Sequence, residues 1–408
     1  MSTVHERMPA GELAARHQRC REMLAERLPD ASGILVFSPV NIYYLSGTLA
    51  FSSIVWLPRE GEPVLMVRRG IARARLESPL ARIVEYRTYG DVARLCAEAG
   101  SPLGDVLGVE QAGLNWGLGD KLRAKFPEAR FTDASQVLQR TRAVKTPFEL
   151  TIIRDTCERH AAAFTEFAAT VRPGMNENDI AWLAWNICVA HGHCGVMRVT
   201  SLESEAFFGQ VAVGGTVNQP FFNDGTIGYI GPHPAMPYMG SDKVIWGPDM
   251  LLIADTTLGW KGYYSDKTMV FWSGKPQTFP DTLRRAQDTC MEIEQRCAEL
   301  MRPGTTPAEL WQTAKAIAEK AGFAEGFMGL GGNKVSFVGH GIGLMSDEWP
   351  AVAGGFNDPL EPGMLLAMEP KIGIAEYGMV GVENMFEVTP EGGRCLSGTV
   401  SDVTFIEG

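Results

Sequence analysis

The chain has 408 residues, and its 48 acidic residues outnumber its 37 lysines and arginines, which gives a formal net charge of −11. This balance argues against a nucleic acid or an anionic membrane as the partner, and the length exceeds one typical domain. The N-terminal residues carry no apolar signal core and no stretch is long enough to span a membrane, so we expect a soluble, cytoplasmic protein. The eight cysteines form no CXXC pair, which predicts reduced thiols.

The first third of the chain alternates helical and strand patterns. Apolar residues at helical spacing predict an amphipathic helix over 12–28, and further helices are expected near 91–98 and 116–125. Short apolar runs predict strands at 33–38, 53–57, 63–67 and 105–110. This alternation predicts an α/β domain. It contains no catalytic constellation, so we expect it to pack, to dimerise and to form a wall of the active site.

A domain boundary is predicted after Ala143, which gives domains 1–143 and 144–408. Just beyond it, Thr146 is suited to cap a helix that begins at Pro147, because its hydroxyl can accept a backbone hydrogen bond. Glu149 completes a capping box. The helix is expected to run to about Val171.

A short internal repeat follows. Arg172-Pro173-Gly174 lies between two helical patterns, and Arg302-Pro303-Gly304 lies between two others in the same way. Each helix–RPG–helix unit is associated with strand-like sequence. The pattern predicts two related halves with helices packed on a curved sheet, whose other face is open.

The stretch 251–268 predicts a β-hairpin that carries two aspartates. An apolar run ends at Asp255, Gly259 and Gly262 mark the turn, and Asp266 lies on the returning strand. Two carboxylates buried side by side repel each other unless they are protonated, hydrogen-bonded or bridged by cations.

Three more polar residues stand beside apolar strand-like sequence. His340 lies in the sequence VGHGIG, Glu369 closes the run MLLAM, and Glu383 follows MVGV. An unpaired charge in such a context is costly, so a metal site is the common explanation for all five residues. One imidazole with four carboxylates suits Mn²⁺, Co²⁺, Fe²⁺ or hydrolytic Zn²⁺, and four carboxylates favour two ions over one.

Together these motifs resemble a known family. Asp255-X10-Asp266, His340 in GHGIG, Glu369 in MEP and Glu383 in VEN match the order and spacing of the five ligands in the pita-bread metallopeptidases. That family contains methionine aminopeptidase, aminopeptidase P and prolidase, with creatinase as a metal-free relative. The stretch 40–47 resembles its N-terminal N-X-X-Y-L-[ST]-G element.

The resemblance implies an α/β (α+β) fold. We expect a creatinase-like N-terminal domain, followed by a pita-bread catalytic domain with duplicated halves and a curved antiparallel sheet. It also implies two divalent metal ions, a dipeptide or small-molecule substrate, and a homodimer. Aromatic residues that the small N-terminal domain is not expected to bury wholly support the dimer: Tyr43, Tyr44, Phe51 and Trp56.

The substrate side of the site departs from the family pattern. Where the peptidases carry two histidines that bind the peptide, this chain has Tyr238 and Asp347, and Met269 replaces a common arginine. A phenol and a carboxylate keep hydrogen bonding but remove a possible cation. An anionic intermediate would be less well stabilised, and a cationic substrate group better received.

Three functions follow from these residues. The first is a di-metal hydrolase of the Xaa-Pro dipeptidase or aminopeptidase type, which cleaves a dipeptide or small amide through a metal-bridging hydroxide that Glu369 helps to activate. Tyr238, Asp347 and Trp349 would bind the substrate, the first two also acting in catalysis. The second is a lyase on a small zwitterion or sulfonium, similar to dimethylsulfoniopropionate lyases, with Asp347 as general base. The third is a non-catalytic binding protein of the same fold.

Overall fold

The protein, described here from a computed structural model, forms two compact units, Met1–Arg142 and Ala143–Gly408. The structure describes residues 6–199, 208–221, 224–398 and 402–407. Within these residues, no helix is long and apolar enough to cross a membrane. All eight cysteines are free thiols, and most are buried.

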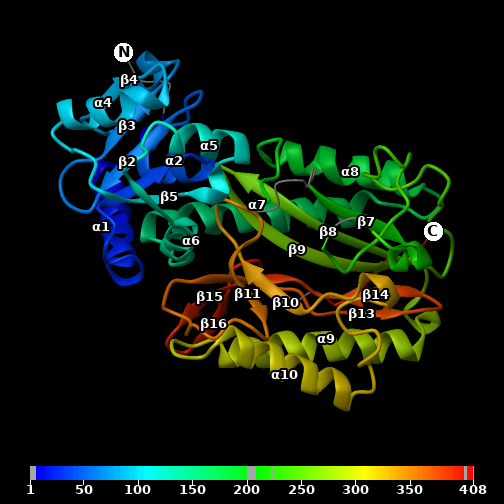
Figure 1. Ribbon diagram of the computed structural model, residues 1–408. Helices are drawn as coiled ribbons and strands as arrows, with labels where there is room; N and C mark the ends of the chain where they lie inside the picture. The colour runs from blue at the N-terminus through cyan, green and yellow to red at the C-terminus, as the bar shows by residue number, and fades with distance from the viewer. Residues whose placement is uncertain (1–5, 200–207, 222–223, 399–401, 408) are drawn as a thin grey trace. The chain divides into compact units, whose positions relative to one another are not determined.

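The N-terminal unit is built on a mixed six-stranded sheet with strand order β4-β3-β2-β1-β5-β6 (Figure 1). The strands are β1 (Gly33–Val36), β2 (Ile54–Pro58), β3 (Val64–Val67), β4 (Ile83–Glu85), β5 (Val106–Val109) and β6 (Arg130–Asp133). The helices are α1 (Ala10–Arg27), α2 (Pro39–Ser46), α3 (Ile71–Glu77), α4 (Val92–Glu98), α5 (Trp116–Arg123) and α6 (Ser135–Ala143). The elements predicted in this region are confirmed within a few residues, whereas α2, α3, α6, β4 and β6 were not foreseen.

The stretch 40–47 folds as helix α2. Ser38 caps it by accepting a hydrogen bond from the backbone N–H of Asn41, and Gly47 ends it with a φ of 73°. A left-handed residue after a helix is a common way to satisfy its last carbonyl groups, and glycine adopts it without strain.

Two of the four aromatic residues that this unit was not expected to bury wholly are in fact buried. Trp56 and Tyr44 are 0% and 1% exposed, and Trp56 packs among the strands with Leu35 and Met66. Phe51, which is 63% exposed, and Tyr43, which is partly buried, fit the expectation. The strands β1 to β3 supply enough apolar surface to cover a tryptophan, because every one of their residues is buried.

The C-terminal unit begins with the predicted capped helix. The Thr146 hydroxyl accepts a hydrogen bond from the backbone N–H of Glu149, and the Glu149 carboxylate accepts one from the backbone N–H of Thr146. These two bonds form a complete capping box, with Pro147 at the first helical position. Helix α7 runs over Pro147–Thr170, so this prediction is confirmed.

Two helix pairs repeat the same design. Helices α7 and α8 (Glu177–Ala190) are joined through Gly174, and α9 (Asp281–Leu300) and α10 (Pro307–Lys320) through Gly304. The two glycines have φ values of 94° and 97°, a conformation that favours glycine. The predicted repeat of helix–RPG–helix units is therefore present in the fold.

Each helix pair accompanies its own sheet. The first contains β7 (Gly209–Val213), β8 (Leu251–Trp260), β9 (Tyr263–Trp272) and β17 (Thr404–Phe405), antiparallel except for the β9–β17 pair. The second has the order β11-β10-β12-β15-β16, with β10 (Phe337–Gly341), β11 (Glu348–Ala353), β12 (Leu365–Met368), β15 (Asn384–Thr389) and β16 (Gly392–Cys395). A two-stranded ribbon pairs β13 (Lys371–Ile374) with β14 (Gly378–Gly381). Short 3-10 helices are Tyr89–Asp91, Gln111–Gly113, Gly214–Asn218, Pro276–Thr278 and Gly331–Asn333.

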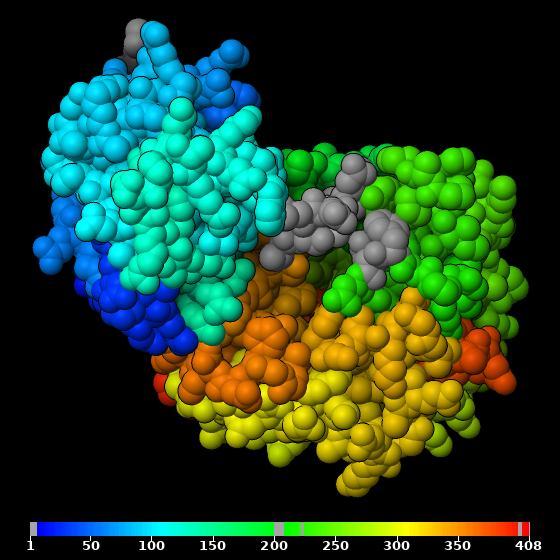
Figure 2. All heavy atoms as spheres, viewed as in Figure 1, coloured from blue at the N-terminus to red at the C-terminus, as the bar shows by residue number. Residues whose placement is uncertain are grey.

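The strands of the C-terminal unit lie between the two helix pairs, with α7 and α8 on one side and α9 and α10 on the other (Figure 1). Two apolar cores result: one beneath α7 and α8 that includes Phe164, Phe167 and Phe271, and a larger one around α9 and α10. The space-filling view shows surface from both helix–sheet halves of the C-terminal unit, the first in green and the second in yellow to orange (Figure 2). The mixed α/β architecture predicted from sequence is confirmed.

Candidate metal centre

The hairpin β8–β9 places its two aspartates on one face. Asp255 lies opposite Thr268, and Asp266 lies opposite Thr257. Because residues two apart on a strand share a face, the two carboxylates are diagonal neighbours on the same side of the hairpin. The turn between the strands is Lys261-Gly262, with both φ values positive, at 49° and 86°. Gly259, predicted as a turn residue, lies within β8.

The second sheet supplies the other three groups. His340 lies on β10, and its partner on β12 is Ala367, two residues before Glu369. Glu383 precedes β15 and forms an isolated bridge with Thr268 of β9. This bridge joins the two sheets at the point where the aspartates lie.

The structure brings all five residues together. Their ligand atoms form two triads, Asp266–His340–Glu383 and Asp255–Glu369–Glu383, within each of which the atoms lie no more than 4.8 Å apart. Glu383 belongs to both. His340 Nε2 is 3.7 Å from Glu369 Oε1 and 3.9 Å from Glu383 Oε1. Asp266, Glu369 and Glu383 are buried, and the set has the size and chemistry of a divalent-cation site.

The titration of these groups reflects their crowding. Burial, followed by the opposing effects of Lys371 and Glu383, raises the pKa of Asp255 to about 7. Burial and then the charges of Glu383 and Asp255 raise the pKa of Asp266 well above its usual value. Burial acts to lower the pKa of His340, but the carboxylates of Glu369 and Glu383 outweigh it, and the pKa is raised. Several carboxylates converge in a space that is largely closed to water, so the centre is suited to bind cations.

His340 is oriented for coordination by its backbone. Its Nδ1 lies 3.0 Å from the carbonyl oxygen of Gly341, to which a protonated Nδ1 would donate. That hydrogen bond leaves the Nε2 lone pair directed at the carboxylates, the tautomer that a metal ligand requires. Thr268 Oγ1 donates to Glu383 Oε2 at 2.9 Å and holds the shared carboxylate in place.

A residue that the sequence analysis missed, Lys371, lies inside the centre. Its Nζ is 2.7 Å from Glu369 Oε2, 3.1 Å from Glu383 Oε2 and 3.1 Å from Asp255 Oδ2, and its side chain is 0% exposed. Burial acts to lower its pKa, but the three carboxylates raise it well above the usual value, so the amine is an ammonium. A signal was available: a single lysine between the apolar residues of β12 and β13 is costly unless it is paired.

The two triads therefore differ in whether they can bind a metal ion. The residues Asp266, His340 and Glu383 fit a divalent cation, and among the described residues no lysine or arginine forms an ion pair with Asp266. The triad that contains Asp255 and Glu369 does not fit one as it stands, because Lys371 already contacts all three of its members.

The three residues assigned to the substrate lie on different elements. Asp347 is half-buried ahead of β11 and is near enough to His340 to add to the charges that raise its pKa. Trp349 on β11 packs partly against the larger core. Tyr238 is half-buried and packs against the core beneath α7 and α8, as does Met269.

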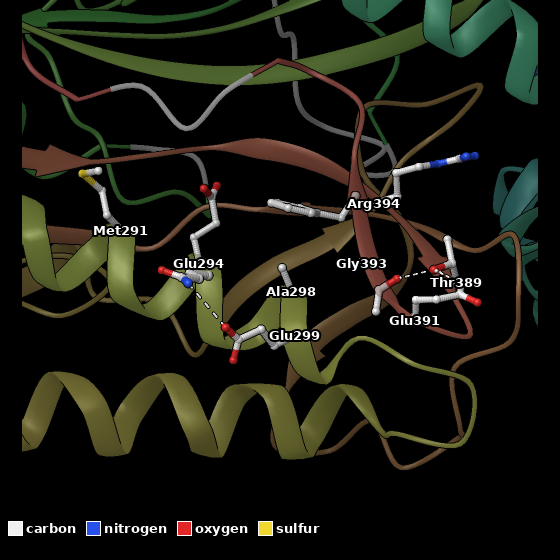
Figure 3. Close-up of a pocket in the computed structure, with 11 residues that line it drawn as sticks. Met291, Glu294, Ala298, Glu299, Thr389, Glu391, Gly393 and Arg394 are labelled. Carbon is white, nitrogen blue, oxygen red and sulfur yellow. Dashed lines mark hydrogen bonds between the residues drawn. The ribbon is translucent and has the colours of Figure 1, made fainter.

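The residue that follows Glu383 in the chain, Asn384, is held by a buried polar network. Asn384 donates to both oxygens of Glu294, at 3.1 and 3.2 Å, and accepts from Lys267 Nζ at 2.6 Å. Glu294 also lines a cavity of about 680 Å³ between α9 and the β15–β16 hairpin (Figure 3). In that view Met291 and Glu294 project from α9 toward the strands that carry Arg394.

A two-domain chain with a largely buried cluster of four carboxylates and one histidine, set between duplicated halves, defines a metallohydrolase of the prolidase type. Comparison with known families agrees. The model of metallopeptidase family M24 matches residues 151–390, and the creatinase/prolidase N-terminal domain matches residues 16–144. The chain belongs to metallopeptidase family M24, as the motifs predicted.

Similar proteins cover from about two thirds to nearly all of the chain. The Xaa-Pro dipeptidase of Pyrococcus furiosus is 24% identical over 90% of this chain and 93% of its own length. That of Lactobacillus helveticus is 29% identical over 70% of this chain and 68% of its own. The solved structure of an Xaa-Pro dipeptidase from Bacillus anthracis superposes with a TM-score of 0.79 at 22% identity, covering 97% of this chain and all of that one, which shows a shared fold.

Proposed function

We propose that the protein is a metal-dependent dipeptidase that hydrolyses Xaa-Pro dipeptides. The observation that carries this proposal is the convergence of Asp255, Asp266, His340, Glu369 and Glu383 at one buried place in a family M24 fold. Relatives that match about nine tenths of the chain carry the name Xaa-Pro dipeptidase.

Asp266, His340 and Glu383 are the residues that we propose as ligands of a divalent ion, and Asp255 and Glu369 complete the predicted ligand set. An oxygen-rich set with one imidazole suits Mn²⁺, Co²⁺ or Fe²⁺, and also hydrolytic Zn²⁺. A bound ion of this kind polarises the scissile carbonyl group and lowers the pKa of water.

The protein's own groups supply the proton transfers. We assign Glu369 as the base that takes a proton from the attacking water and passes it to the leaving proline nitrogen. Its Oε2 accepts a hydrogen bond from Lys371, whereas its Oε1 faces His340 Nε2. One oxygen thus anchors the carboxylate while the other is directed into the centre.

We assign substrate binding to three residues: Asp347, Tyr238 and Trp349. A free dipeptide carries an ammonium group, and the carboxylate of Asp347 beside His340 is suited to receive it. The Tyr238 hydroxyl is assigned as a neutral hydrogen-bond donor, and the Trp349 ring as an apolar surface for proline.

The alternative functions are less well supported. The similar proteins are named as dipeptidases, which does not favour a lyase on a sulfonium substrate. A non-catalytic protein would not need four carboxylates, one histidine and a lysine buried around one point.

We also propose a homodimer that works in the cytoplasm, with an N-terminal domain of 1–143 and a catalytic domain of 144–408. The exposed aromatic side chains of the N-terminal unit, Phe51 and Trp116, support an interface there. Free, mostly buried thiols suit a reducing compartment. A monodisperse monomer in light scattering would contradict the dimer.

The test is hydrolysis of Ala-Pro by protein stripped with a chelator and then given Mn²⁺, Co²⁺, Fe²⁺ or Zn²⁺ in turn. We expect proline to be released only after metal is restored, and no elimination product from dimethylsulfoniopropionate. Elimination without dipeptide cleavage would establish the lyase instead. The absence of both activities with every metal would contradict an enzyme of either kind.

A further inference from the structure

The centre already contains one cation of its own. The ammonium of Lys371 lies within 3.1 Å of an oxygen from each of Asp255, Glu369 and Glu383. Three oxygens from three separate segments of the chain surround one nitrogen, and those carboxylates would otherwise surround a metal ion in the same way. Lys371 therefore stands where a second ion would bind.

The fold makes specific room for this lysine. Lys371 begins β13, and its partner across the ribbon is Gly381. A Cβ atom on Gly381 would lie 2.7 Å from Lys371 Cγ and 2.6 Å from the carbonyl oxygen of Pro370. Both distances are shorter than the van der Waals contacts that Cβ atoms make in proteins. The lysine stem thus fills the space that the missing side chain leaves, and the side chain, 0% exposed, is not a surface lysine that has folded inward.

The two glutamates divide their oxygens between two sides. In both Glu369 and Glu383, Oε2 contacts Lys371 Nζ, whereas Oε1 lies toward His340 Nε2, at 3.7 and 3.9 Å. Each carboxylate therefore bridges from the ammonium to the side of His340 and Asp266. The same bridging is what glutamates do between two metal ions, here with a lysine in one of the two positions.

Repulsion and space favour one ion over two. The ammonium of Lys371 already occupies the position between Asp255, Glu369 and Glu383. A second divalent ion would have to share the same three oxygens with the ammonium, at contact distance from a like charge. It would also have to expel a side chain that is packed against Gly381.

We infer that this protein binds a single divalent ion, at Asp266, His340 and Glu383, and that Lys371 takes the place of the second cation. The inference departs from the two ions expected from the sequence, and it rests on the proposed function only in using that triad as the metal seat. Lys371 is then a positioning residue: it holds Glu369 by a hydrogen bond and keeps Asp255 paired.

The experiment counts metal on the intact protein. Wild type, Lys371→Ala and the matched control Lys145→Ala are loaded with excess Mn²⁺, desalted and analysed by inductively coupled plasma mass spectrometry. Lys145 is also a buried lysine, paired with Glu348 at 3.4 Å and not with the five ligands. We expect one Mn²⁺ per chain in wild type and in the control, and two in Lys371→Ala.

Electron paramagnetic resonance gives an independent reading of the same samples. Wild type should show the hyperfine pattern of an isolated Mn²⁺ ion, and Lys371→Ala the pattern of a spin-coupled pair. If Lys371→Ala does not fold, the wild-type count and spectrum still decide the question.

Two ions in wild type, or a single ion in well-folded Lys371→Ala, would overturn the inference. The outcomes separate it from the proposed function. Wild type with two ions that cleaves Ala-Pro contradicts the single ion and leaves the dipeptidase standing. Wild type with one ion that cleaves no dipeptide does the reverse, and wild type that binds no ion contradicts both.

Discussion

Buried carboxylates occur in two kinds of surroundings in this protein. Glu177, at the start of α8, accepts hydrogen bonds from Val213 N, Ser241 N and Thr216 Oγ1, at 2.9, 2.8 and 2.7 Å. These neutral donors oppose the burial that raises its pKa. Glu110 of the N-terminal unit is held in the same way by two backbone N–H groups and the amide of Asn41.

The carboxylates of the centre face one another instead. Asp266 accepts from Lys267 N at 3.1 Å, and its other close neighbours include the charges of Glu383 and Asp255, which add to the effect of burial. The difference teaches how to separate structural from functional acids. A carboxylate surrounded by neutral donors stabilises the fold, whereas carboxylates that converge with few donors are kept for a cation.

The sharpest test of this contrast removes a ligand. Asp266→Asn should abolish metal binding and lower dipeptide turnover about thousandfold, since metal assistance contributes several kcal/mol to such reactions. Because the change also relieves repulsion, the metal-free variant should unfold at no lower temperature than metal-free wild type. Metal content, turnover and calorimetry give the three readings. Retained metal with full turnover would remove Asp266 from the ligand set.

Glu294 is intermediate between the structural and the functional carboxylates, because it has one neutral donor, the Asn384 amide, which contacts both of its oxygens. Burial raises its pKa from 4.5 to about 8, which the Asn384 amide opposes. Because the folded value is above the unfolded one, the folded state keeps a proton that the unfolded state releases. The stability from Glu294 is complete below about pH 4.5 and is lost as the pH rises to about 8.

Glu294→Gln should remove this dependence, because an amide keeps the shape without titrating. Urea unfolding of metal-free protein at several pH values across that window measures it. The free energy of unfolding should fall with pH more steeply in wild type than in the variant. Equal slopes would mean that Glu294 is ionised in the folded protein.

Asp347 extends the contrast to the substrate side. Asp347→Asn and Asp347→His should each lower turnover about hundredfold, the scale of a key transition-state contact or general base. Metal content should not change, because Asp347 is not among the five ligands. Faster Ala-Pro cleavage by Asp347→His would mean that a histidine serves the peptide better there, and that the carboxylate has no role of its own.

A substitution at Glu177 tests the role of a structural carboxylate. Glu177→Ala leaves the donors of Val213, Ser241 and Thr216 without their acceptor, so the free energy of unfolding should fall by about 2 kcal/mol. Metal affinity and KM should stay at wild-type values. Denaturant titration and metal titration together check this, and a loss of metal affinity without a loss of stability would contradict the assignment.

The smallest effect is expected at Tyr238. Tyr238→Phe removes one neutral hydroxyl, so turnover on Ala-Pro should fall only by a factor that corresponds to about 0.5–1.5 kcal/mol. Steady-state kinetics against wild type measures it. A loss as large as that of Asp347→Asn would make the phenol a participant in proton transfer.

Local signals account for what the sequence predicted well. The Thr146–Glu149 capping box, the two RPG connections and the apolar run before Asp255 each specify structure over a few residues. The motif order around His340, Glu369 and Glu383 then indicated a common site, which the spacing of strands brings about.

What the sequence did not show depends on contacts between distant segments. Lys371 becomes meaningful only when β13 is known to pass beside Asp255, more than a hundred residues earlier in the chain. Trp56 looked too large for a small domain until its neighbours from several strands were placed around it. Gly259 resembled a turn residue, but a Cβ there would lie 2.7 Å from the Tyr264 ring, so glycine at 259 keeps the hairpin close-packed.

The bridge between Thr268 and Glu383 has a consequence for how the protein is made. Asp255 and Asp266 belong to the first half of the catalytic unit, and His340, Glu369 and Glu383 to the second, so neither half contains a complete set of ligands. During synthesis the centre comes into being only after the last strands have emerged and the two sheets have met. Metal uptake is therefore a late event in the life of the chain, and a nascent or truncated molecule has no active centre to engage a substrate prematurely.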